Sequence, residues 1–166
     1  MCGFVCIYKK SGITSEDRAA AKEMSHTIRH RGPDLNRTYE NEKLIFAFRR
    51  LSIIDLEGGA QSFVSEDGRY SCVYNGEVYN YLELKKELEQ KGETFRTNSE
   101  VEVMVKLYAL YGADFISRLR GMFAFLIYDR EKDVLMCGRD PFGIKPLYYR
   151  IDGNGIVLCS EMKGFF

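Results

Sequence analysis

The second residue of this chain is a cysteine, followed by Gly3 and a short apolar run that ends at Tyr8. Removal of Met1 would leave a thiol and a free α-amine on Cys2. The reference pKa of a thiol is about 8.5 and that of an α-amine about 8, so near neutral pH the amine can accept the thiol proton. Nucleophile and general base would then share one residue. The alternative interpretation is that Cys2 is a small buried residue opening a first strand.

Two clusters contain arginines. The stretch 29–34 reads Arg-His-Arg-Gly-Pro-Asp, which also fits the cation-rich end of a helix closed by Gly-Pro. Arg50 lies between two apolar runs, where burial is costly unless a carboxylate pairs with the guanidinium. That carboxylate could belong to the protein or to a substrate held by two parallel hydrogen bonds. A strand-edge arginine that reaches solvent is the alternative.

Two further clusters contain glycine. Asn75-Gly76 follows an apolar run and is typical of a turn. Alternatively, the Gly76 N–H and the Asn75 carboxamide donate to one substrate oxygen, as an oxyanion hole requires. The segment 139–149 contains two prolines and one glycine, so we expect it to form a tight connection that supports a site. Arg139 and Asp140 are expected to form an ion pair.

Composition limits the classes of function. Lys+Arg and Asp+Glu both number 24, which gives no bulk attraction to nucleic acid or to an anionic membrane. No segment approaches the roughly 20 apolar residues of a membrane span, and the N-terminus has no signal-peptide pattern. A cytoplasmic protein without nucleic-acid or membrane partners is expected.

The cysteines point to neither a disulfide framework nor a metal site. They are five in number, dispersed and without a C-x-x-C pair, so a zinc site is not expected either. Three of them occur in apolar, strand-like runs and are expected to be core thiols: Cys72, Cys137 and Cys159.

The elements that must position these residues follow from periodicity and turn chemistry. Three helices are expected, at 15–28 with Ser15 as N-cap, at 81–91 and at 99–111. Asp34 is expected to be followed by a long loop. Strands are expected at 3–8, 44–48, 51–56, 69–74, 122–129, 133–138, 146–151 and 155–160. Strands at both ends with two helices grouped between them indicate an α+β layered domain.

Taken in order, six motifs resemble one family. They are Cys2-Gly3, RHRGPD at 29–34, RLSIID at 50–55, NGEVYN at 75–80, GMFAFLIYD at 121–129 and GRDPFGIKPLYY at 138–149. The chain resembles the class II glutamine amidotransferase domain over essentially its whole length, 1–166. It is most like the N-terminal glutaminase domain of glutamine-hydrolysing asparagine synthetase.

The resemblance implies a fold and a reaction. The fold is the four-layer αββα sandwich of the N-terminal nucleophile hydrolases, with two antiparallel sheets between helix layers. The reaction converts glutamine to glutamate and ammonia through a glutamyl thioester on Cys2. Asn75 and Gly76 would stabilise the oxyanion, and Arg50 would bind the substrate α-carboxylate. The rest of the pocket would be formed by the backbone at Leu51, Ser52, Ile53 and Ile54 and by the side chain of Glu77.

One position departs from the family pattern. The family usually has an aspartate at the start of the helix at 99–111, where it holds the substrate α-ammonium. Here that position is Glu100, which keeps the charge and is one methylene longer. A catalytically silent domain that binds a ligand or a partner is therefore a second hypothesis. It would also follow if Met1 were retained, because the α-amine would then be acylated.

The resemblance also implies what the chain works with. No cofactor is expected in this domain, whereas ATP and Mg²⁺ are expected in a C-terminal synthetase domain, whose phosphate loop has no counterpart here. The chain is thus expected to be a fragment, with glutamine and that synthetase domain as partners, and a homodimer is left open. A third hypothesis keeps the glutaminase but gives the nitrogen to a sugar or another carboxylate.

Overall fold

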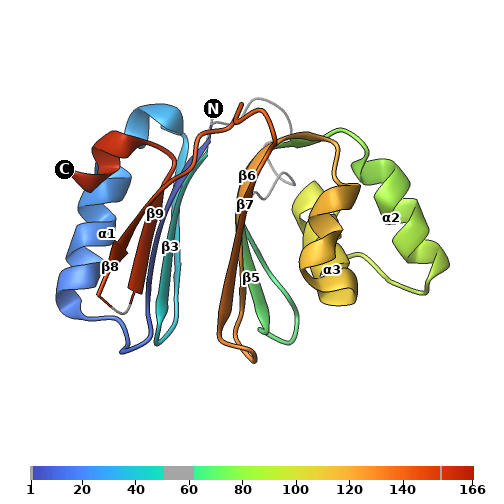
Figure 1. Ribbon diagram of the computed structural model, residues 1–166, viewed down its shortest axis with the longest axis horizontal. Coiled ribbons are helices and arrows are strands. Elements are labelled where there is room, and N and C mark those ends of the chain that lie inside the picture. The colour runs from blue at the N-terminus through green and yellow to red at the C-terminus, as the bar shows by residue number, and fades with distance from the viewer. Residues whose placement is uncertain (1, 51–61, 154) are drawn as a thin grey trace. The chain divides into compact units, whose positions relative to one another are not determined.

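The computed structural model describes residues 2–50, 62–153 and 155–166 (Figure 1). The chain divides into two compact units. The first comprises residues 1–53 and 146–166, and the second comprises residues 54–145.

The first unit is an antiparallel sheet with one long helix. Its strands are ordered β2-β3-β1-β9-β8, so β1 pairs on both sides. Helix α1 contacts β1 and β3 and lies along one face of the sheet (Figure 1). The elements are β1 (Gly3–Lys9), α1 (Ser15–Thr27), η1 (Arg29–Arg31), β2 (Leu35–Glu40), β3 (Leu44–Arg50), β8 (Tyr148–Asp152), β9 (Gly155–Cys159) and η3 (Met162–Phe165).

The core of this unit follows from strand alternation. Val5 and Ile7 face α1 together with Ala47 and Ile45 of the paired strand. Phe4 and Cys6, which alternate with Val5 and Ile7 along β1, therefore lie on the opposite face.

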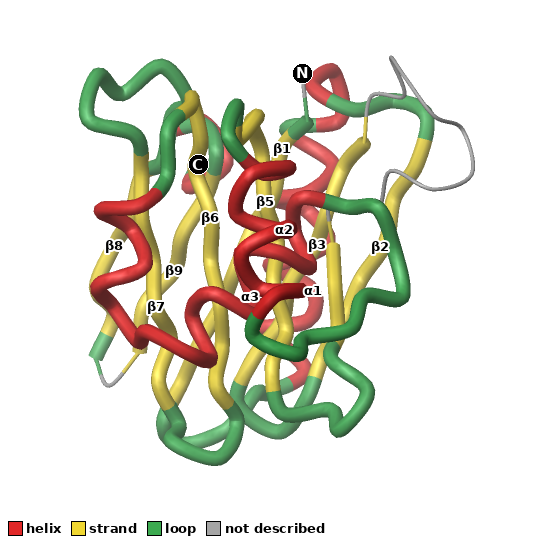
Figure 2. The backbone as a smooth tube through the Cα atoms, turned by 90° about the vertical axis from the view of Figure 1, so that its right-hand side faces the viewer, coloured by secondary structure: helices red, strands yellow, loops and turns green. Residues whose placement is uncertain are grey.

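The second unit is a four-stranded antiparallel sheet, ordered β4-β5-β6-β7, with its helices on one face. Helix α3 contacts β5, and α2 contacts α3 (Figure 1). Figure 2 shows the turns that connect the strands at the strand ends. The elements are β4 (Ser62–Val64), β5 (Tyr70–Val78), α2 (Tyr81–Gln90), α3 (Glu100–Tyr111), η2 (Gly112–Arg118), β6 (Gly121–Asp129) and β7 (Val134–Arg139).

Several expectations about the elements need correction. The N-cap of α1 is Thr14, whose hydroxyl accepts the Asp17 N–H in a capping box; Ser15 is already helical. The stretch after Asp34 is not a loop but strand β2. The expected strand at 51–56 lies outside the described residues.

Two expectations about side chains are also wrong. Cys137 is exposed on β7, whereas Cys72 and Cys159 are buried as expected, and none of the cysteines forms a disulfide. Arg139 and Asp140 do not pair: the Arg139 guanidinium donates to carbonyls of the following loop. Asp140 instead accepts backbone N–H groups at 123, 142, 144 and 145, because a short carboxylate can organise a tight connection in this way.

No helix in the described part of the chain combines the length and the apolar character needed to cross a bilayer. Every pair of neighbouring strands in the described residues is antiparallel, and the helices lie on the faces of these antiparallel sheets. The α+β class is therefore confirmed.

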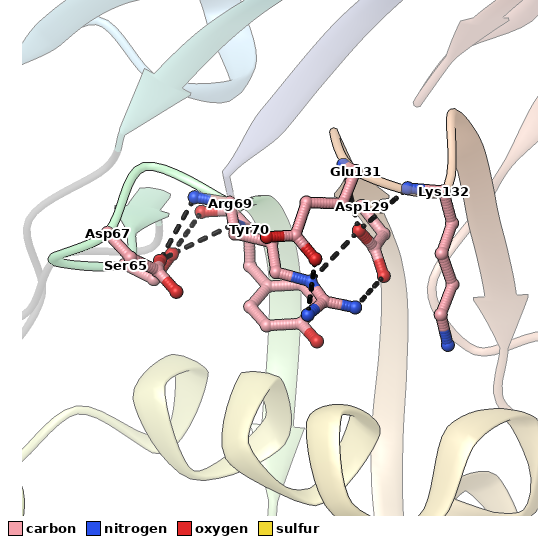
Figure 3. A network of polar contacts seen from close by, with 7 residues as sticks. All are labelled: Ser65, Asp67, Arg69, Tyr70, Asp129, Glu131 and Lys132. Carbon is pink, nitrogen blue, oxygen red and sulfur yellow. Dashed lines mark hydrogen bonds and ion pairs between the residues drawn. The ribbon is translucent and has the colours of Figure 1, made fainter.

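One ion pair closes the β5–β6 ladder at the end away from Asn75 (Figure 3). The Arg69 guanidinium donates from Nε to Oδ1 of Asp129 at 3.1 Å and from Nη2 to Oδ2 at 3.0 Å. Asp129 is fully buried and also accepts the N–H groups of Glu131 and Lys132. Burial disfavours its charge, but these donors outweigh burial and hold its pKa below the ordinary value.

We expect Asp129→Ala to lower the free energy of unfolding by about 2 kcal/mol near pH 7, because it leaves buried donors unpaired. The pKa of Asp129 is lowered by folding, so its contribution is present above the unfolded-state pKa and lost as pH falls through the folded-state pKa. The difference between variant and wild type in urea titrations should shrink in acid. The control is Glu40→Ala, which breaks the exposed Arg18–Glu40 pair and should cost below about 1 kcal/mol. Equal losses would contradict this assignment.

Candidate functional site

Cys2 and Arg50 lie on one face of the first sheet. Gly3 of β1 pairs with Arg49 of β3, and the Arg49 Nε donates to both the carbonyl and the hydroxyl of Ser25 in α1, at 3.1 and 3.0 Å. Arg49 therefore faces the helix. Neighbouring residues on a strand face opposite sides, so half-buried Arg50 and Cys2, which directly precedes β1, face away from α1.

Buried Arg31 fixes the backbone of Cys2. Its Nε donates to the Cys2 carbonyl at 2.9 Å, and its Nη1 donates to Oε1 of Glu161, also at 2.9 Å. Burial opposes the charge of Glu161, but hydrogen bonds from Arg31 and two other side chains outweigh it and lower the pKa to about 2. Gly3 is needed beside this guanidinium, because a Cβ there would lie 2.9 Å from Cδ of Arg31.

The glycine of the RHRGPD motif also has a steric role. A Cβ on Gly32 would overlap the backbone between Arg49 and Arg50, so the chain crosses β3 at this point without room for a side chain. By residue type this motif fits a helix terminus, and the family resemblance, which also includes the motif, assigned no role to any of its residues. Its third residue, Arg31, is a functional residue that sequence reasoning missed, and the neighbouring Gly-Pro gave no signal of the contact with Cys2.

Asn75-Gly76 is not a turn, because β5 continues through it to Val78. Gly76 pairs with Phe123 of β6, whose N–H and C=O both bond to Asp140 on the β7 side, at 3.3 and 2.8 Å. In an antiparallel ladder this makes Gly76 and Phe123 a non-hydrogen-bonded pair. The Gly76 N–H is therefore directed away from β6. A Cβ on Gly76 would overlap the Met122 carbonyl, and its φ of +154° also disfavours a side chain.

Asn75 supplies a second donor at this point of the strand. Its side chain is 2 % exposed, and its Nδ2 has no hydrogen-bond partner within the described ranges. A buried unpaired donor costs about 1–3 kcal/mol, so it calls for an explanation. An oxygen of a bound substrate would satisfy it.

Two carboxylates begin α3, and the structure separates their roles. Glu102 is buried and accepts the backbone N–H groups of Arg96 and Thr97 at 3.0 and 2.8 Å, so it organises the preceding loop. Glu100 turns to β5 instead, where its Oε2 accepts the Val78 N–H at 2.6 Å. Val78 has the same parity as Gly76, so Glu100 lies along the strand edge that carries the Gly76 N–H.

The environment of Glu100 disfavours its charge. Burial raises the pKa of Glu100 to about 7; the Val78 N–H and the Tyr74 hydroxyl lower it, and the charge of exposed Glu77 raises it further. Tyr74 is a second residue that sequence reasoning missed. Neighbouring strand residues face opposite sides, so from the sequence Tyr74 is expected to be a core residue on the face opposite Asn75, and nothing more.

The predicted site residues thus fall into two groups, each described within its own unit. Glu100 and the 75–78 segment come together. A cavity of about 380 Å³ lined by Asn80, Leu84 and Arg118 among others contains none of them. Among the described residues, no cluster of His, Cys, Asp or Glu could hold a metal. Cys2 and Arg50 belong to the first unit; Asn75, Gly76, Glu77 and Glu100 belong to the second; Leu51, Ser52, Ile53 and Ile54 lie outside the described residues.

Two curated proteins are similar to this chain over nearly its whole length. Asparagine synthetase [glutamine-hydrolyzing] 1 of Bacillus subtilis is 47% identical over 165 residues, covering 98% of this chain and 26% of the relative. Asparagine synthetase B [glutamine-hydrolyzing] of Escherichia coli is 40% identical over 164 residues, covering 98% of this chain and 29% of the relative. The chain therefore spans less than a third of the length of these relatives.

The solved structures share the fold. Glutamine phosphoribosylpyrophosphate amidotransferase of B. subtilis matches with a TM-score of 0.74 at 22% identity, over 99% of this chain and 43% of that one. The allosteric regulatory enzyme of purine biosynthesis matches with a TM-score of 0.75 at 23% identity, over the same shares. The fold expected from the resemblance is thereby confirmed.

The sequence profile of one family, described as "Glutamine amidotransferase domain", matches residues 1–166. With the relatives that share nearly the whole chain, this match shows that the chain belongs to the glutamine amidotransferase domain family.

Proposed function

We propose that this domain hydrolyses glutamine at Cys2 and supplies the ammonia to a synthetase of the asparagine synthetase type. The observation that carries the proposal is the pair of donors on β5: the buried Asn75 Nδ2, unpaired within the described residues, and the outward Gly76 N–H. Donors arranged in this way are what the oxyanion of an acyl-transfer reaction requires.

The reaction balances with the groups of this chain. After removal of Met1, the Cys2 α-amine takes the thiol proton and the thiolate attacks the side-chain amide carbon of glutamine. The resulting oxyanion accepts from Asn75 and Gly76. The α-ammonium returns its proton to the leaving nitrogen, so ammonia departs and a thioester remains. Water, deprotonated by the same amine, then releases glutamate.

The remaining site residues would hold the amino-acid end of glutamine. Arg50 offers a planar fork for the α-carboxylate, which a lysine reproduces poorly. Glu100 offers a carboxylate for the α-ammonium, with Glu77 nearby. Arg31 keeps the Cys2 backbone in place and is a positioning residue.

The nucleophile is tested by Cys2→Ala. The protein should release glutamate and ammonia from glutamine, and the variant should lose this activity by at least roughly a thousandfold. It should still bind glutamine in titration calorimetry. Cys6→Ala, which removes a buried thiol on the same face of β1, is the matched control and should retain turnover. Processed wild type that produces no glutamate would instead support the silent domain, and intact mass shows whether Met1 is gone.

The role of Arg50 is tested against its neighbour. Arg50→Lys should raise KM for glutamine roughly 10- to 100-fold while kcat at saturation changes little, because the fork acts in binding. Arg49→Lys should leave KM unchanged, since the Arg49 side chain bonds to Ser25 on the helix face. A common effect of both variants on kcat would contradict the assignment.

The acceptor is the finer part of the proposal. The relatives that match best in sequence among those described are asparagine synthetases, which favours aspartate over a sugar. ATP and Mg²⁺ would then act in a synthetase domain and not in this one. The full-length protein with ATP, Mg²⁺ and amide-labelled glutamine should transfer the label to aspartate; transfer only to another carboxylate or sugar acceptor would overturn this part.

A further inference from the structure

Tyr74 places a polar hydroxyl in an apolar core. Tyr74 is fully buried, and its ring packs in the apolar cluster that includes Phe123 and Phe125. Phenylalanine would fill the same volume. The Tyr74 hydroxyl has no hydrogen bond in the described part of the chain, although buried hydroxyls normally have one.

The carboxyl of Glu100 lies beside this hydroxyl: Tyr74 packs against α3, which begins at Glu100, and Glu100 bonds to Val78 on the same strand as Tyr74. The two affect each other's titration: Tyr74 lowers the pKa of Glu100, and burial together with Glu100 raises that of Tyr74. The carboxyl is already bonded through Oε2 to the Val78 N–H. The Tyr74 hydroxyl is the buried donor on the same strand that is left for this carboxyl among the described residues.

We infer that Tyr74 is a positioning residue that donates to Glu100 when glutamine is bound, and thereby sets the pH range in which the site accepts the substrate ammonium. The inference rests on the proposed glutaminase function. It adds a residue that the sequence places in the core, and it concerns the glutamate that replaces the family's aspartate.

The physical reason is the balance of charge around Glu100. The titratable side chains that face it in the described residues, Tyr74 and Glu77, both belong to β5. Neither supplies a positive charge, so a buried carboxylate there is stabilised only by donors. The substrate α-ammonium supplies the missing charge. Binding therefore favours the ionised form, and a carboxyl that is protonated in the free site must release its proton.

The sign of the pH dependence follows. Glu100 has a pKa of about 7 in the free domain, so below that pH an increasing share of sites is neutral and binds the ammonium less well. KM for glutamine should rise as pH falls through 7. Without the Tyr74 hydroxyl, the carboxyl keeps its proton to higher pH, and the rise in KM should begin at higher pH.

The test compares Tyr74→Phe with Tyr108→Phe in the full-length protein. Tyr108 packs in the same core, and it is two helical turns, about 12 Å, from Glu100 along α3. At pH 7, Tyr74→Phe should raise KM roughly three- to tenfold with kcat within about twofold, and the two variants should converge near pH 8.5. A KM profile of Tyr74→Phe that superimposes on those of wild type and Tyr108→Phe would overturn the inference.

A second measurement avoids dependence on the folding of Tyr74→Phe. Calorimetric titration of Cys2→Ala with glutamine, in buffers of different ionisation enthalpy, gives the protons released on binding. Release should be substantial at pH 6.5 and near zero at pH 8.5, and Glu100→Gln should abolish it. No release at pH 6.5 would contradict the inference. A wild-type protein that binds glutamine with this release but forms no glutamate would sink the proposed function alone.

Discussion

The proposed chemistry of Cys2 depends on holding the start of β1 in a fixed place. The first residues of a domain are usually poorly ordered unless they are tied down. Here β1 lies at the centre of its sheet and pairs with β3 and β9 from its first residues. Ser160 bonds to the N–H and carbonyl of Phe4, and Arg31 bonds to the Cys2 carbonyl. The residue proposed as nucleophile, Cys2, is thereby held in a fixed position.

The second unit applies the same principle to the proposed oxyanion site. The site is built into the middle of a strand, where the ladder fixes the direction of every N–H. The N–H and C=O of Phe123 both bond to Asp140, so the Gly76 N–H is directed away from β6. Asp140 thus acts on the site through one strand, which explains why the loop after β7 needs a buried carboxylate. Placing the Glu100 carboxyl at the same edge buries it, and this burial raises its pKa.

Residue types indicated candidate site residues more directly than they indicated the elements around them. Cys2 and Asn75-Gly76 have residue types that suggest chemistry by themselves, and the order of the motifs chose between the alternatives. Strand β2 was missed because Leu35–Glu40 has little apolar alternation and pairs at an edge. Asn-Gly was interpreted as a turn because these residue types favour turns locally. Local propensity does not show that β5 pairs with β6 through Gly76. The hydrogen bonds of Arg31 with Cys2 and of Glu100 with Val78 join residues far apart in sequence, which no local pattern encodes.

The most direct test of the central claim is to capture the covalent intermediate. Protein from which Met1 has been removed is mixed with glutamine, quenched in acid and digested, and the peptides are weighed. The account predicts the mass of one glutamyl group on the thiol of the peptide that begins with Cys2. Glutamate released while that peptide stays unmodified at every quench time, or a glutamyl group found on Cys6 instead, would contradict it.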